Sequence, residues 1–183
     1  MRASARRLVE AQGFAATTIA AIAADAGVSE QTIYAAFGGK AGLVGAMLED
    51  IEQAADASGT EASLATARSA AEQLDVFLEW ICRLFEHGRP IFLAAADAAH
   101  DPDVGAMVEA GNTRRREGTD LLTRAWAEQG ALRRDLSPRA ASETLWILTS
   151  FQQYRFATDA LGWSTDTYRA WLAGVLHLYL FAP

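Results

Sequence analysis

Residues 17–40 read TTIAAIAADAGVSEQTIYAAFGGK, a pattern typical of two short helices joined by a tight turn. Apolar residues such as Ile19 and Ile22 recur at helical spacing in the first half of this stretch. Gly27 follows, where a helix commonly ends in a left-handed residue, and Ser29 is placed to cap the second helix. Two short helices joined in this way form the helix-turn-helix pair, whose second helix enters the major groove of DNA.

The second predicted helix, residues 29–37, has an apolar side and a polar side. Ile33 and Phe37 lie on the apolar side and are expected to hold the helix against its neighbours. The outward side chains can bond to base edges or phosphates, and they are Glu30, Gln31, Thr32 and Tyr34. The same pattern also fits an ordinary helical corner with a solvated face, so it leaves both interpretations open.

A longer series of residues keeps a fixed spacing across three predicted helices. Its members lie in roughly the first fifty residues: Gly13-Phe14, Thr17-Thr18-Ile19, Ile22-Ala23, Ala26-Gly27-Val28-Ser29, Thr32-Ile33-Tyr34, Phe37, Lys40 and Leu43. This order resembles the DNA-binding domain of the TetR family, the tetracycline-repressor-like regulators. The resemblance departs at the N-terminus, where family members carry a longer first helix, often after a basic arm.

The resemblance implies which residues contact DNA. The hydroxyls of Thr18 and Tyr34 would donate to phosphates, and Lys40 would clamp one phosphate together with the start of its own helix. Contacts to bases would fall to the first turn of the second helix. The full predicted set is Thr17, Thr18, Ser29, Glu30, Gln31, Thr32, Tyr34 and Lys40.

Two members of this set also fit a purely structural role. Glu30 suits a first-turn carboxylate that the helix dipole favours, and Tyr34 suits an aromatic residue of the core. The net charge of −7 is unusual for a DNA-binding protein, and residues 1–50 contain four basic and five acidic groups. We therefore expect binding to depend on a few placed cations such as Arg2, Arg6, Arg7 and Lys40, with weak affinity for non-specific DNA.

Length and composition predict an all-helical protein of one or two small domains. Glycine and proline are sparse, 51% of the residues are hydrophobic, and no stretch alternates apolar and polar residues as a strand would. Together with the resemblance to the TetR family, this implies a helix-turn-helix DNA-binding domain over residues 1–46 and a helical ligand-binding and dimerisation domain over residues 47–183. The helices expected beyond the first domain are 43–55, 62–87, 91–99, 102–129, 138–162 and one capped by Ser164, with a break at Gly88-Arg89-Pro90.

Several functional classes receive no support from the sequence. The single cysteine, Cys82, suits a reducing compartment and a buried, inert thiol better than a redox sensor. The three histidines are scattered without metal-ligand spacing, so neither a metal nor a cofactor is expected. No segment is long and apolar enough to span a membrane, which favours a cytoplasmic location.

The last two predicted helices, residues 138–161 and 164–181, are apolar on more than one side. Tyr168, Leu172 and Leu176 belong to one stripe, while Leu178 lies off it. A helix with two apolar faces is buried on both, and family members pair through their last two helices. We therefore expect a homodimer that binds a palindromic operator, although both helices would also fit the centre of one subunit.

The middle of the chain is rich in aromatic residues. Aromatic walls with a few polar groups suit a pocket for an apolar or aromatic small molecule, although each of these residues also fits a solid core. The predicted ligand-binding set is Trp80, Phe85, Phe92, Trp126, Trp146, Phe151, Gln152 and Tyr154. The sequence thus predicts a repressor that a small-molecule inducer releases from DNA. One alternative is a helical protein-interaction module. The other is an enzyme, which no nucleophile with a nearby base and no cofactor loop supports.

Overall fold

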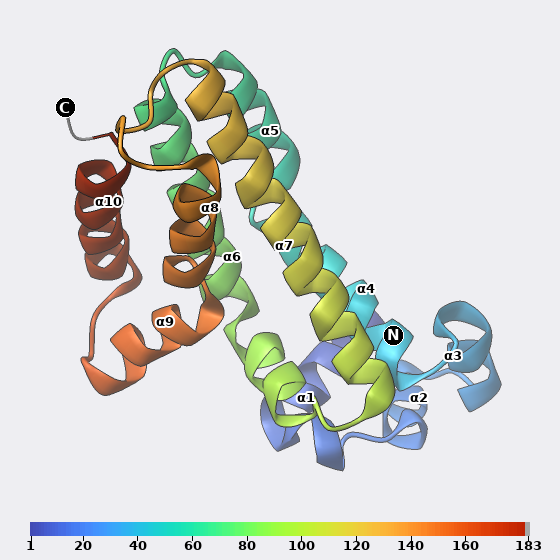
Figure 1. The fold of residues 1–183 in the computed structure, drawn as a ribbon. Helices are drawn as coiled ribbons and strands as arrows, with labels where there is room; N and C mark the ends of the chain where they lie inside the picture. Colours follow the sequence, from blue (N-terminus) through green and yellow to red (C-terminus); the bar gives the residue numbers. More distant parts are fainter. Residues whose placement is uncertain (182–183) are drawn as a thin grey trace. The chain divides into compact units, whose positions relative to one another are not determined.

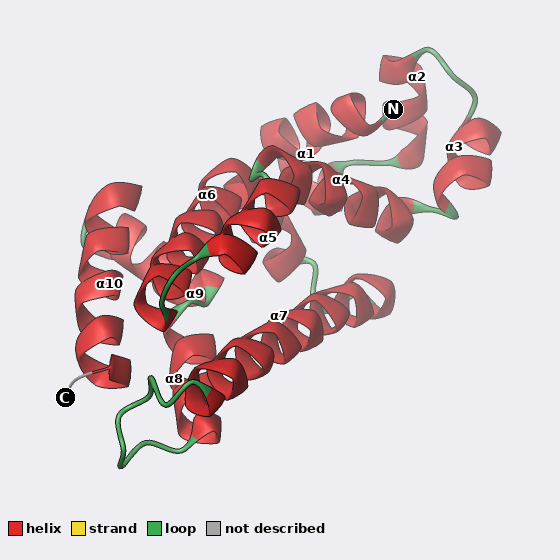
Figure 2. Ribbon diagram, turned by 90° about the horizontal axis from the view of Figure 1, so that it is seen from above, coloured by secondary structure: helices red, strands yellow, loops and turns green. Residues whose placement is uncertain are grey.

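The computed structural model describes residues 1–181 and contains only helices and their connections in that range (Figures 1 and 2). The chain divides into two compact units, one of residues 1–54 and 87–111, the other of residues 55–86 and 112–183. The helices are α1 (Arg2–Ala16), α2 (Ile19–Ala26), α3 (Glu30–Phe37), α4 (Lys40–Ala54), α5 (Ala57–Thr66), α6 (Ala70–Asp97), α7 (Pro102–Glu128), α8 (Pro138–Leu148), α9 (Phe151–Arg155) and α10 (Thr165–Phe181), with a π-helical turn over Phe156–Ala160. The all-helical prediction is confirmed. A functional boundary between residues 46 and 47 stays a prediction.

Helices α2 and α3 begin and end at the signals that the sequence carries. The Thr18 hydroxyl accepts a hydrogen bond from the amide of Ala21, and Ser29 Oγ accepts from the amide of Thr32 at 3.2 Å. Gly27 adopts the left-handed conformation, with φ 66°, and its amide donates to carbonyls in the last turn of α2. Capping by polar side chains and termination at glycine therefore give both helices their lengths.

Two of the predicted boundaries in the middle of the chain are wrong. Residues 58–60, which lie between two predicted helices, are inside α5, because Asp56 caps this helix by accepting from the amide of Gly59 at 3.1 Å. The predicted helix 62–87 is instead divided, with α6 starting at Ala70.

The predicted break at Gly88-Arg89-Pro90 is also absent, since α6, which is 28 residues long, continues through it to Asp97. Proline removes one helical hydrogen bond, but tertiary packing outweighs that cost here. Ile91 is fully buried, and Gly88 lies so close to Ile51 of α4 that a Cβ would meet its side chain at 2.8 Å.

The predicted helix 138–162 is divided as well. Ser137 caps α8 as expected, but α8 stops before Thr149 and Ser150 caps a new helix, α9. The Thr149 hydroxyl donates to the carbonyl of Leu145 at 2.6 Å. Adjacent Thr and Ser hydroxyls offer the backbone an alternative to the helical pattern, which accounts for the division.

The remaining helices confirm the sequence signals. Asp101 accepts from the amides of Asp103 and Val104 at the start of α7, and Ser164 accepts from Thr167 at the start of α10. None of the helices within residues 1–181 is long and apolar enough to cross a lipid bilayer.

Candidate nucleic-acid interface

Helix α3 presents a polar surface opposite a buried anchor. Ile33 is completely buried, whereas Tyr34 on the next position is 53% exposed and Gln31 is exposed as well. The structure records no hydrogen bond within residues 1–181 for the Gln31 amide or the Tyr34 hydroxyl. These side chains are therefore available to an external partner, as contact with DNA requires.

Other hydroxyls of the predicted DNA-binding set already have partners inside the protein. The Thr32 hydroxyl lies 2.8 Å from Ser29 Oγ, and both belong to the cap of α3. Thr17 is completely buried and donates to the carbonyl of Gly13 at 2.8 Å. Thr18 is exposed and caps α2. The structure thus assigns Thr17 to packing and leaves Thr18 at the surface.

Lys40 lies at the first residue of α4, as predicted, but its ammonium group is turned toward α1. Nζ donates to the carbonyl of Phe14 at 2.5 Å and lies 4.0 Å from the centre of the Phe14 ring. Burial lowers the pKa of Lys40. Sequence reasoning did not find this contact, because it depends on the tertiary packing of two helices.

The remaining cations of residues 1–50 are also engaged. Arg2 pairs with Asp50 at 2.6 Å and with Glu49 at 3.4 Å. Arg6 pairs with Glu10 at 2.7 Å, and Arg7 pairs with Asp25. All four cations on which the sequence analysis expects DNA binding to depend therefore have acceptors within their own unit.

Part of the predicted ligand-binding set forms an aromatic cluster in the second unit. The ring of Phe85 lies 5.5 Å from that of Phe151 and 5.6 Å from that of Tyr154. Tyr154 in turn packs edge-on against Tyr168 at 5.5 Å. The structure thus brings Phe85, Phe151 and Tyr154 together around α6, α9 and α10.

The other members of that set lie elsewhere. Trp126 is fully buried, donates to Gln73 at 2.7 Å and packs against Phe181, whereas Gln152 is exposed. Phe92 belongs to the first unit. Trp80 and Trp146 each have a buried indole nitrogen without a hydrogen-bond partner in the described part of the chain.

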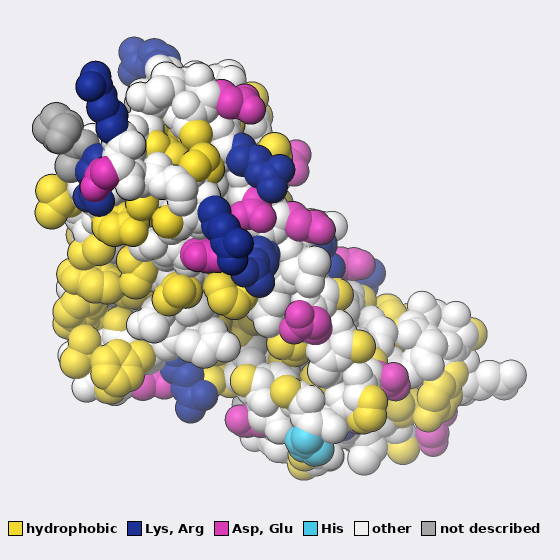
Figure 3. Space-filling view, viewed as in Figure 1, with side chains coloured by type: hydrophobic (Ala, Val, Ile, Leu, Met, Phe, Trp, Pro, Cys, Tyr) yellow, Lys and Arg dark blue, Asp and Glu magenta, His cyan; other side chains and the backbone are white. Residues whose placement is uncertain are grey.

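Helices α8 and α10 pack together within the second unit and expose apolar side chains. Leu178 is 71% exposed, and Ile147, Trp171 and Val175 are also exposed, while Leu172 is buried on the inner side of α10. Figure 3 shows hydrophobic side chains gathered over α10. The two apolar faces expected for α10 are therefore present, with one of them uncovered.

Helix α3 follows a glycine turn, is capped by Ser29 and is anchored by Ile33, and the chain continues into a second helical unit. This arrangement is typical of helix-turn-helix DNA-binding regulators. Residues 2–47 match the family model of bacterial regulatory proteins, tetR family. No curated protein matches the sequence. Solved structures share the fold over nearly the whole chain.

A putative TetR-family regulator from Rhodococcus sp. is 18% identical with a TM-score of 0.75, covering 98% of this chain and 95% of that one. A putative regulator from Saccharomonospora viridis in complex with choline is 21% identical with a TM-score of 0.77 and the same coverages. NalD, the secondary repressor of the MexAB-OprM multidrug efflux pump in Pseudomonas aeruginosa, is 21% identical with a TM-score of 0.76, covering 98% and 94%. Residues 2–47 are thus a tetR-family DNA-binding domain, and the chain has the fold of tetR-family transcriptional regulators.

Proposed function

We propose that this protein is a homodimeric transcriptional repressor that binds a palindromic operator through α3 and is released by a small molecule. The observation that carries the proposal is the exposed surface of α3, where Gln31 and Tyr34 have no partner within the described chain while Ile33 anchors the helix. A rigid helix with free hydrogen-bonding side chains is what contact with base edges requires. The DNA-binding domain would comprise residues 1–46.

The division of labour on this surface follows from which groups are free. Gln31 is the candidate for bidentate contact with adenine, and the Tyr34 and Thr18 hydroxyls are candidates for phosphates. Glu30 is exposed at the start of α3 and would accept from cytosine. Lys40 would support the site by holding α4 against the end of α1.

The uncovered apolar face of α8 and α10 supports dimerisation. Exposed apolar residues that cluster on one face mark an interaction surface, and a two-fold axis brings the same face of a second copy against it. A dimer of this kind would place two copies of α3 about 34–36 Å apart, which is one turn of DNA.

Ligand release would operate by a shift between two conformations. A small molecule that binds more tightly to the conformation with low DNA affinity weakens operator binding by that same ratio of affinities. The aromatic cluster of Phe85, Phe151 and Tyr154 is the candidate wall for an apolar or aromatic ligand. The neighbour from Saccharomonospora viridis, solved with choline, supports a small-molecule role for this fold.

Selection of binding sites from a random DNA pool tests the proposal. The expected result is an inverted repeat whose half-sites are one helical turn apart. A pool that yields no enriched sequence, or an enriched site without two-fold symmetry, would contradict the proposal.

A further inference from the structure

A hollow of about 540 Å³ lies between α7 and the N-terminal end of α8, and no residue of the aromatic cluster lines it. Its cationic lining residues are Arg116 and Arg124 from α7 and Arg139 from α8, and its acidic ones are Asp120 and Glu143. Figure 3 shows Arg and Asp or Glu side chains gathered on this face. All of these residues belong to the second unit.

Both acidic groups of the hollow are already engaged. Glu143 accepts from Arg139 Nε at 2.9 Å, and Asp120 accepts from the Ser142 hydroxyl. By contrast, the structure records no carboxylate partner within residues 1–181 for Arg116 or Arg124. A hydroxyl donor does not neutralise Asp120, so the lining carries three positive and two negative charges, a net charge of +1.

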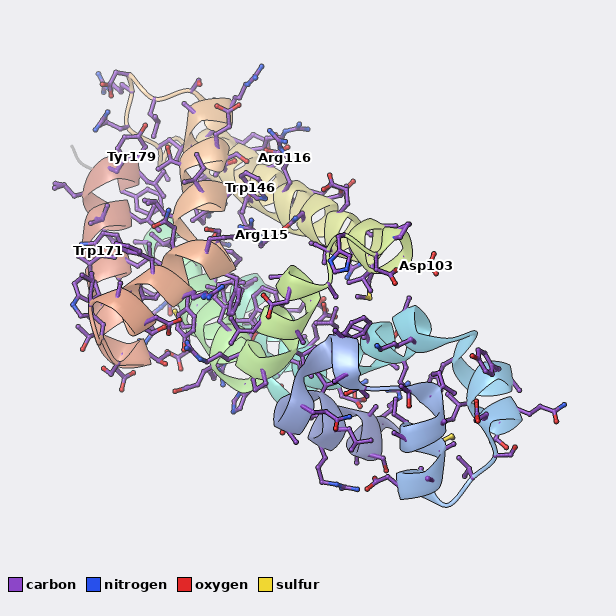
Figure 4. All side chains as sticks on the ribbon, turned by 90° about the horizontal axis from the view of Figure 1, so that it is seen from below. Asp103, Arg115, Arg116, Trp146, Trp171 and Tyr179 are labelled. Atoms are coloured by element: carbon purple, nitrogen blue, oxygen red, sulfur yellow. The ribbon has the colours of Figure 1, made fainter. Side chains whose placement is uncertain are left out.

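Cations without a carboxylate partner and one unpartnered N–H lie beside the hollow. The guanidinium groups of Arg115 and Arg116 lie 4.9 Å and 5.4 Å from the Trp146 ring, and Figure 4 shows these three side chains at the meeting of α7 and α8. Arg115 donates to the carbonyl oxygens of Trp146 at 2.6 Å and Thr149 at 3.3 Å, but it has no carboxylate partner within residues 1–181. The buried indole nitrogen of Trp146 has no acceptor among the described residues.

A half-buried guanidinium without a counter-ion loses solvation without gaining a charge partner. Burial accordingly lowers the pKa of Arg115 to about 10. Arginine donors beside an aromatic ring are well suited to the planar oxygens of a carboxylate or the tetrahedral oxygens of a phosphate. An anion is the species that would supply the counter-charge that these guanidinium groups lack.

The geometry points to a binding site for a small multivalent anion, bearing phosphate or carboxylate groups, in the hollow between α7 and α8. Arg116 and Arg124 bind the anion directly, and Arg139 contributes from the first turn of α8 while it stays paired with Glu143. The Trp146 ring positions Arg116, and Arg115 holds Trp146 by donating to its carbonyl oxygen. The site is separate from the α3 surface, so it does not depend on the proposed DNA binding.

Isothermal titration calorimetry of the full chain tests this site, with pyrophosphate and citrate as probes at constant ionic strength in chloride. Saturable binding of either anion with one site per chain is expected. Arg116→Gln and Arg124→Gln should each raise the Kd about tenfold, since each removes a charge-assisted contact. The ratio of the two affinities then tells whether phosphate or carboxylate is preferred.

Arg134→Gln is the matched control, because Arg134 is exposed, carries the same charge and does not line the hollow. It should leave the Kd within twofold of that of the unchanged protein. Trp146→Phe replaces the indole by a smaller aromatic ring and removes the unpartnered N–H. Thermal unfolding of this variant shows whether the protein still folds. Absence of saturable binding by the folded unchanged protein, or an equal loss in Arg134→Gln, would overturn the assignment.

Discussion

Lys40 holds the end of α1 by donating to the carbonyl oxygen of Phe14 and covering its ring at 4.0 Å. The contact joins residues on two helices of the DNA-binding domain and gives the Phe14 carbonyl a second donor, beside the Thr17 amide at 3.2 Å. Lys40 thus makes a structural contact, while its phosphate contact stays a prediction. The consequences for stability and for DNA binding differ, so the two roles are separable.

Replacing Lys40 by Met removes the ammonium group while retaining much of the apolar stem. We expect the free energy of unfolding to fall by about 1–3 kcal/mol, because a charge-assisted hydrogen bond and a cation–π contact are lost. Chemical denaturation measures this directly. An unchanged unfolding free energy together with weakened operator binding would assign Lys40 to the phosphate role instead.

The pairing of Arg2, Arg6, Arg7 and Lys40 predicts an operator affinity that depends only weakly on salt. Each phosphate neutralised by a cation contributes about −0.9 to the slope of log K against log salt concentration. With the cations engaged internally, we expect a slope shallower than about −2 for each DNA-binding domain. Fluorescence anisotropy across a salt series measures this slope. A slope near −4 for each DNA-binding domain would mean that all four cations leave their partners for DNA.

The helix caps of the DNA-binding domain were predictable because they are local. Thr18, Ser29 and the left-handed Gly27 act within one turn of their own helix, so the sequence carries the whole signal. The role of Lys40 was not predictable in the same way, because its acceptor lies 26 positions away and is a backbone carbonyl.

The continuity of α6 was missed for a related reason. Glycine and proline are reliable local signals for a helix end, yet here the cost is outweighed by the burial of Ile91 and the close approach of Gly88 to Ile51. Aromatic composition likewise could not assign the ligand-binding set. It does not distinguish the clustered Phe85 and Tyr154 from Trp126, which is fully buried against Phe181.

Substitution of Gly88 by Ala tests how tightly α6 packs at this position. The new Cβ would meet the Phe92 ring at 2.6 Å and Ile51 at 2.8 Å, so we expect a loss of about 1–3 kcal/mol in unfolding free energy despite the higher helix propensity of alanine. Gly118→Ala in α7 is the control, since no described atom outside its own helical neighbourhood lies within 4 Å of its added Cβ, and it should stabilise the protein by about 0.5–1 kcal/mol. Equal effects at the two glycines would show that packing at Gly88 is not tight.

Leu178→Lys tests the proposed dimer face. A charge at the centre of an apolar interface is strongly unfavourable, so the variant should elute as a monomer with unchanged helical content. Light scattering coupled to size-exclusion chromatography measures the mass. Leu121→Lys changes an equally exposed leucine on α7, 72% against 71%, and should leave the dimer intact. A monomeric mass for the unchanged protein would contradict the proposed homodimer.

Burial raises the pKa of the Cys82 thiol to about 12 from an ordinary 9.0. The folded protein therefore keeps the proton that the unfolded chain releases above pH 9, and stability present below pH 9 is lost as the pH rises toward 12. We expect unfolding free energy to fall by up to about 1.4 kcal/mol per pH unit more in the unchanged protein than in Cys82→Ala. Identical pH slopes would show that the thiol ionises equally in both states.

The most direct test of the central claim compares Gln31→Ala with Gln53→Ala on the selected operator and on the same operator with single base changes. Both glutamines are exposed, one on α3 and the other on α4. We predict that Gln31→Ala loses about 1–3 kcal/mol of binding free energy and no longer discriminates at one base pair of each half-site, while Gln53→Ala binds as the unchanged protein does. Unchanged affinity and unchanged base preference in Gln31→Ala would contradict the claim that the exposed surface of α3 contacts the bases.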